Sequence, residues 1–168
     1  VASDERALFV VAAVCELAFF LIAAGAMLRA VLRTSNARNY AMPWLIVALG
    51  LTDALFLWAV LQGDVAAAMR SLSAGLLVMT AIALVVGRRV IPFFAMRAIN
   101  GLQVPMLMRV GHVQLALCAL AALSALWGSM SVVAGALGVT GLLSLLQVWA
   151  WKPMRVLDRP LLWILYLG

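Results

Sequence analysis

Five long apolar runs constrain this chain more than any other feature of its sequence. They cover residues 7–28, about 40–61, roughly 72–86, 110–127 and 131–151. A helix that is apolar on every side must be buried in protein or in lipid, and a chain of 168 residues has too small an interior to enclose five of them. We therefore predict an all-α, polytopic transmembrane helix bundle that is embedded in a lipid bilayer.

Composition and pattern exclude the other fold classes. The chain is 67% hydrophobic and 11% charged, whereas a soluble domain is roughly half apolar and about a quarter charged. A transmembrane β-barrel would alternate in polarity over segments of roughly 10 residues, and these runs are continuous instead. The first run is longer than a signal-peptide core of about 7–15 residues and further runs follow it, so we expect it to span the membrane.

The two ends of the sequence suggest a piece of a larger protein. The chain begins at Val1 without a methionine, and a fresh apolar run that starts at Leu161 stops at Gly168. Eight helical residues at ~1.5 Å each reach about 12 Å, which is short of the ~30 Å hydrocarbon core. We expect residues 1–168 to form one transmembrane domain, with five spans and the start of a sixth, that packs against missing helices of the same protein.

The positive charges predict the orientation of the chain. Ten of the twelve Lys and Arg residues fall within residues 29–39, 88–109 and 152–160, and only Arg6 and Arg70 belong to the opposite side. Because cytoplasmic loops accumulate Lys and Arg, these three loops are expected in the cytoplasm and the N-terminal end in the periplasm. The net charge of +6 therefore reports topology, and no nucleic-acid partner is expected.

Two carboxyl groups lie in the middle of apolar runs. Glu16 is central in the first run and Asp53 is central in the second, with Gly50 one turn before it. A charge at such a depth costs about 2.5–3.5 kcal/mol, so both side chains are expected to face the bundle interior. Two interpretations remain open, namely a protonated carboxyl bonded to a neighbouring helix and a group on a proton or ion pathway.

The metal-ligating residue types are few and scattered. Cys15 and Cys118 lie in apolar runs without a CxxC spacing, so we expect them to pack as small hydrophobic residues. His112 is the only histidine and lies at the expected cytoplasmic end of the fourth run. Since one histidine cannot ligate haem from both sides, His112 is not expected to be a ligand, and no metal site or catalytic residue is predicted.

Small and basic residues suggest two further features. The fifth run carries a stripe of small residues that predicts a helix-packing face: Ala134, Gly135, Gly138, Gly141 and Ser144. Residues 90–111 mix aromatic, Met and Arg side chains, which favours an interfacial segment, with Pro92 at a bend or an end. Arg88 and Arg89 are expected to anchor the chain at the membrane surface, the alternative being an anion or lipid-phosphate site.

Three short motifs resemble those of one known family. The first is Gly87, Arg88, Arg89, Val90, Ile91, Pro92, Phe93 and Phe94. The second is Asn-Ala-Arg-Asn-Tyr at residues 36–40, and the third is Arg-Pro-Leu-Leu-Trp-Ile-Leu at residues 159–165. Their order and separations, over about residues 33–168, resemble the NnrS family. Ala95 stands where that family often has Thr, and the arginine pair stands where a single Arg is usual.

The resemblance implies a bacterial inner-membrane protein that is associated with haem and copper and with nitric oxide metabolism or tolerance. The family's histidine-rich segments have no counterpart here, so its haem and copper ligands are expected outside these residues. Two other functions remain open. One is a secondary transporter or permease in which Glu16 and Asp53 are coupling carboxyls, and the other is a structural subunit of a membrane complex. Nothing in the sequence identifies an enzyme.

Overall fold

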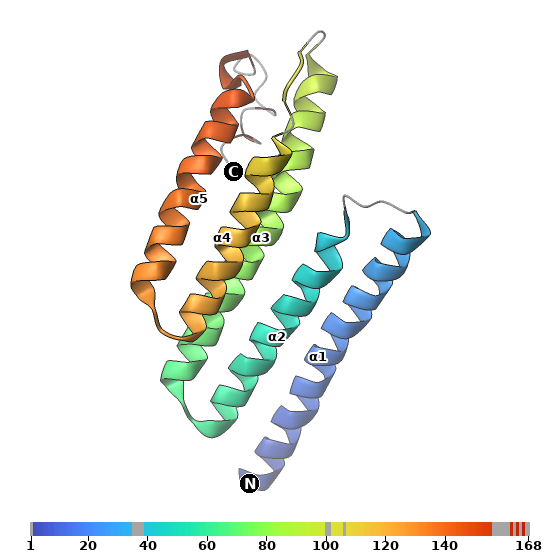
Figure 1. The fold of residues 1–168 in the computed structure, drawn as a ribbon. Helices are drawn as coiled ribbons and strands as arrows, with labels where there is room; N and C mark the ends of the chain where they lie inside the picture. The colour runs from blue at the N-terminus through green and yellow to red at the C-terminus, as the bar shows by residue number, and fades with distance from the viewer. Residues whose placement is uncertain are drawn as a thin grey trace. The chain divides into compact units, whose positions relative to one another are not determined.

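The computed structural model describes residues 2–34, 39–99, 102–105 and 107–155 together with Leu162, Ile164 and Tyr166. Its helices, in chain order, are α1 (Ala2–Arg33), α2 (Ala41–Gln62), α3 (Val65–Ala98), α4 (Met108–Leu126) and α5 (Met130–Ala150), and the short 3-10 helix η2 (Pro153–Arg155) follows (Figure 1). No strand occurs in these ranges. The predicted all-α class is confirmed.

The helices α1 to α5 are each long and apolar enough to cross a membrane. Their apolar side chains point outward as well as inward, and on α1 Leu21 and Ile22 are 69% and 72% exposed. Trp127 and Trp149, near helix ends, are also largely exposed, which is typical of aromatic residues at a membrane–water interface. The chain is therefore a multi-pass membrane protein whose helices are covered by lipid.

The helix α3 is much longer than the run of residues 72–86 that was expected to span. It continues through Pro92 to Ala98, so of the two alternatives expected at Pro92, a bend or an end, the end is wrong. Proline lacks an N–H, so the helix loses one hydrogen bond, to the Arg88 carbonyl. Burial of the Pro92 ring and of Ala95 offsets this loss. Residues 90–98 thus belong to α3 and do not form a separate interfacial segment.

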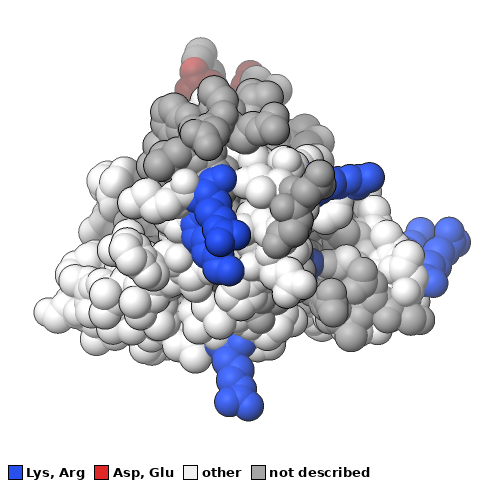
Figure 2. All heavy atoms as spheres, turned by 90° about the horizontal axis from the view of Figure 1, so that it is seen from above, with Lys and Arg blue, Asp and Glu red and all other residues white. Residues whose placement is uncertain are grey.

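The helix bounds place many of the basic residues on the last turns of helices. Arg29 and Arg33 belong to α1, which was expected to end at residue 28, and Arg97 is in the last turn of α3. At ~1.5 Å per residue, 32 to 34 residues exceed the ~30 Å hydrocarbon core, so charged ends can reach the headgroups. Figure 2 shows Lys and Arg side chains at several separate places on a surface that is mostly uncharged. The motifs at residues 36–40 and 159–165 lie largely outside the described residues.

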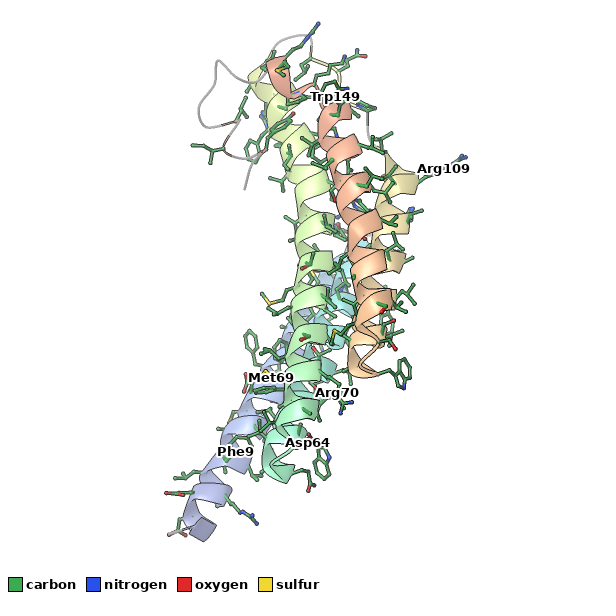
Figure 3. All side chains as sticks on the ribbon, turned by 90° about the vertical axis from the view of Figure 1, so that its left-hand side faces the viewer. Phe9, Asp64, Met69, Arg70, Arg109 and Trp149 are labelled. Carbon is green, nitrogen blue, oxygen red and sulfur yellow. The ribbon has the colours of Figure 1, made fainter. Side chains whose placement is uncertain are left out.

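Two tight turns reverse the chain, after α2 and after α4. Gly63 and Gly128 both adopt positive φ, at 71° and 76°, a conformation that glycine reaches without strain. In each turn the glycine N–H and the next N–H bond back to helix carbonyls, as in a Schellman motif. Asp64 then caps α3, since its Oδ1 accepts the Ala67 N–H at 2.9 Å (Figure 3).

The described chain divides into two compact units. The first comprises Val1–Met79 and Ala122–Ser129, and the second comprises Thr80–Ala121 and Met130–Gly168. In the first unit α1 and α2 run antiparallel side by side (Figure 1). In the second, a core cluster forms at one end of α3 and α5 from Ala95, Leu102, Val104 and Trp151.

Candidate functional site

The two intramembrane carboxyls lie at one helix interface of the first unit. Asp53 on α2 is half-buried, and its Oδ2 is buried without a hydrogen-bond partner among the described residues, whereas Glu16 on α1 is exposed. One turn further along α1, Phe20 meets Gly50, which lies one turn before Asp53. In this antiparallel helix pair, Glu16 and Asp53 are therefore each one turn away from the contact between Phe20 and Gly50.

Neighbouring carboxyl groups in a medium of low polarity resist double ionisation, and such a pair holds one proton more readily than two isolated groups would. The Glu16 side chain is exposed within the described residues, whereas Asp53 is partly enclosed. Both interpretations of Glu16 and Asp53, a structural pair and a proton or ion pathway, stay predictions.

A buried polar ladder joins α4 to α5 in the second unit. Gln114 is 1% exposed and donates from Nε2 to the Ser144 hydroxyl at 3.0 Å. Ser144 in turn donates to the Thr140 carbonyl at 2.9 Å, and the Thr140 hydroxyl donates to the Ala136 carbonyl at 2.8 Å. Sequence reasoning missed this ladder, although the spacing of residues 140, 144 and 147 puts three polar side chains on one face of an apolar helix.

The glycine stripe of α5 is not the face that meets α4. A Cβ added at Gly135, Gly138 or Gly141 would find no atom within 4 Å in the described residues. The buried positions of α5 are instead Ala136, Thr140 and Gln147. Of the predicted stripe, Ser144 does meet α4, because it accepts the Gln114 hydrogen bond, whereas the three glycines do not.

The candidate ligand residues stay apart from one another. His112 is exposed on α4, next to residues such as Arg109 that point away from the helices (Figure 3). Cys118 is 1% exposed, and its thiol is hydrogen-bonded with Thr140. Cys15 is exposed, and both cysteines are free thiols. In the part of the chain that the structure describes, no group of three or more His, Cys, Asp or Glu side chains could hold a metal ion.

The first sequence motif occupies the last third of α3. Its arginine Arg88 is half-buried and Pro92 is almost fully buried, while Phe93 and Phe94 are about half exposed. The two phenylalanine rings meet edge to face at 5.5 Å, and the Arg97 guanidinium lies 5.6 Å from the centre of the Phe93 ring. The motif therefore has an inward side, with Arg88 and Pro92, and an outward aromatic side.

Comparison of the chain with models of protein families assigns these motifs to one family. The sequence model described as NnrS protein matches residues 3–168. The chain belongs to the NnrS family. Neither a curated protein nor a solved structure matches it. The resemblance drawn from three motifs over residues 33–168 is thus confirmed. The match also covers the first helix, which carries Glu16.

Proposed function

We propose that this chain is the central transmembrane part of a bacterial inner-membrane protein that acts in nitric oxide metabolism or tolerance. The match to the NnrS family over residues 3–168 is the observation that supports this most strongly. The helices that are long enough to span a membrane agree with it. In the orientation that the basic residues favour, the N-terminal end is periplasmic and residues 29–39, 88–109 and 152–160 are cytoplasmic.

We propose further that the full-length protein carries haem and copper through ligands outside residues 1–168. An iron held within a helix bundle needs axial ligands, normally His, Met or Cys. The described residues do not fit a complete centre of this kind, since His112 is exposed and solitary and Cys118 is enclosed beside Thr140. On this proposal, α1 to α5 act as the scaffold, and Glu16 and Asp53 are the proton-handling carboxyls within it.

Deletion of the gene in its own bacterium tests the proposal. We expect the deletion strain to grow more slowly than its parent under a nitric oxide donor and at the parental rate without it, and a plasmid copy to restore growth. Unchanged tolerance, together with full-length protein that purifies without haem or copper, would contradict the proposal. A strain that instead loses uptake of a solute, with the loss reproduced by Asp53→Asn, would favour the transporter interpretation.

A further inference from the structure

A cavity of about 460 Å³ lies between α3 and α5 in the second unit. Its volume falls within the ~300–1,000 Å³ of typical small-molecule sites. Most of its lining is apolar, including Leu84, Val86, Val90, Ile91 and Val148. The polar exceptions include Arg88, Ser144, Gln147 and Trp151. Such a cavity suits a ligand with an apolar body and a small polar end.

Two lining residues carry buried donors that lack an acceptor. Within the described residues, Arg88 Nη1 and Trp151 Nε1 are both buried without a hydrogen-bond partner. Leaving a buried donor unpaired costs about 1–3 kcal/mol, and more when the group is charged. Both orphan groups donate and neither accepts, so the missing partner is an acceptor, and the guanidinium favours an anionic one.

The position of Arg88 is built into the fold. A Cβ added at Gly111 on α4 would collide with Arg88 Nη1 and lie 3.0 Å from its Cζ. The glycine leaves room for the guanidinium where it lies, at the side of α3 that faces α4. An arginine that served only as a surface anchor would not need such space, because its long side chain would extend to the headgroups.

The chain offers little to neutralise this charge. Between Asp64 and Asp158 the sequence contains no Asp or Glu, whereas the same stretch contains seven basic residues, Arg70, Arg88, Arg89, Arg97, Arg109, Lys152 and Arg155. Among the described residues of the second unit there is accordingly no carboxylate to pair with Arg88. The complementary charge must come from another molecule or from residues outside that set.

Trp151 supplies the second donor from a rigid position. It is 3% exposed, its ring meets the Tyr166 ring edge to face at 6.2 Å, and its carbonyl accepts the Tyr166 hydroxyl at 3.1 Å. It also packs in the cluster with Ala95 and Leu102. A tryptophan held in this way keeps its Nε1 fixed, which suits recognition of an acceptor group.

We propose that this cavity binds an anionic phospholipid, whose phosphate accepts hydrogen bonds from Arg88 and Trp151 and whose acyl chain lies along the apolar lining. A basic pocket between spanning helices is a known chemical setting for acidic lipid headgroups. The lipid is favoured over a free phosphate ion because the cavity lining is mainly apolar and the helices that form it stand in the bilayer.

The test is a lipid titration of the delipidated full-length protein, followed by native mass spectrometry. Phosphatidylglycerol is the probe, phosphatidylethanolamine is the lipid without net charge, and inorganic phosphate is the competitor. We expect phosphatidylglycerol to bind more tightly than phosphatidylethanolamine. Arg88→Gln should weaken its binding roughly tenfold or more, the size of one charge-assisted hydrogen bond, and Trp151→Phe roughly threefold.

Arg97→Gln is the matched control, because it removes the same charge from the same helix at an exposed position beside Phe93. Equal binding by the wild type and Arg88→Gln would overturn the proposal, as would an equal loss in Arg97→Gln. Displacement of the lipid by equimolar inorganic phosphate would assign the site to a free anion instead. If Arg88→Gln cannot be purified, the Trp151→Phe variant is titrated instead. Unchanged phosphatidylglycerol binding by that variant would overturn the proposal.

Discussion

Phe20 of α1 packs directly on Gly50 of α2, so closely that a Cβ added to Gly50 would lie 2.9 Å from the Phe20 Cβ. The next turn of the same antiparallel pair brings Glu16 to Asp53. On its other side, α2 places the Thr52 hydroxyl 3.2 Å from where a Cβ of Gly75 on α3 would be. The position of the carboxyl pair in the first unit therefore depends on glycine at a helix contact.

Gly50→Ala is expected to lower the free energy of unfolding by roughly 1–3 kcal/mol, because the added methyl group has to push Phe20 aside. Gly138→Ala is the matched control, since a Cβ at that position meets nothing within 4 Å. The control should be neutral or gain up to about 1 kcal/mol from better helix propensity. Unfolding of the purified protein in mixed micelles measures both changes, and equal effects would contradict the close packing.

Asp53→Asn and Glu16→Gln should each stabilise the protein at alkaline pH, because each removes one member of a like-charge pair. The double variant should gain less than the sum of the two single gains, with a coupling on the order of 1 kcal/mol, as found for residues in contact. Asp4→Asn, in the exposed first turn of α1, should show no coupling to Asp53→Asn. Strict additivity of Glu16→Gln and Asp53→Asn would refute the interaction.

The hydrogen bond from Gln114 to Ser144 should be measurable in a double-mutant cycle of Gln114→Ala and Ser144→Ala. We expect a coupling energy of about 0.6 kcal/mol and no more than ~1.7 kcal/mol, the range found for hydrogen bonds between membrane helices. Gln62→Ala, at an exposed residue of α2, should be additive with Ser144→Ala. A coupling energy of zero between Gln114→Ala and Ser144→Ala would show that the hydrogen bond contributes nothing to stability.

The orientation can be checked with cysteines placed at Ser129 and Arg155 after Cys15 and Cys118 have been replaced by Ala. Both positions are exposed, and Ser129 bonds only through its backbone N–H, so its turn tolerates the change. In intact cells an impermeant thiol reagent should label Ser129→Cys, whereas Arg155→Cys should react only after permeabilisation. The opposite pattern would place the basic loops in the periplasm.

Full-length protein with His112→Ala should keep its haem. His112 is exposed on α4 and belongs to no cluster of ligand residues in the described part of the chain. The Soret absorbance per protein, compared with that of the wild type, measures the effect. Loss of that absorbance in a variant that still folds, as judged by its elution from a sizing column, would make His112 a ligand and contradict the proposed location of the centre.

The sequence allowed the five spans to be predicted because hydropathy is a local property of the chain. The ends of α1 and α3 were missed. Arginines on a last turn look like loop residues, although their side chains can reach the headgroups while the backbone stays helical. Pro92 likewise looks like a helix end, but packing around its ring outweighs the loss of one hydrogen bond.

The sequence by itself determined that this is a membrane protein, where along the chain the positive charges fall and to which family the chain belongs, because each follows from the order and chemistry of residues along the chain. Tertiary structure alone decided that Phe20 packs on Gly50, that Gln114 bonds Ser144 and that Arg88 occupies the space left by Gly111. In helices that are apolar on all sides, hydrophobicity does not select a packing face. That choice depends on close contacts and hydrogen bonds between residues far apart in the sequence.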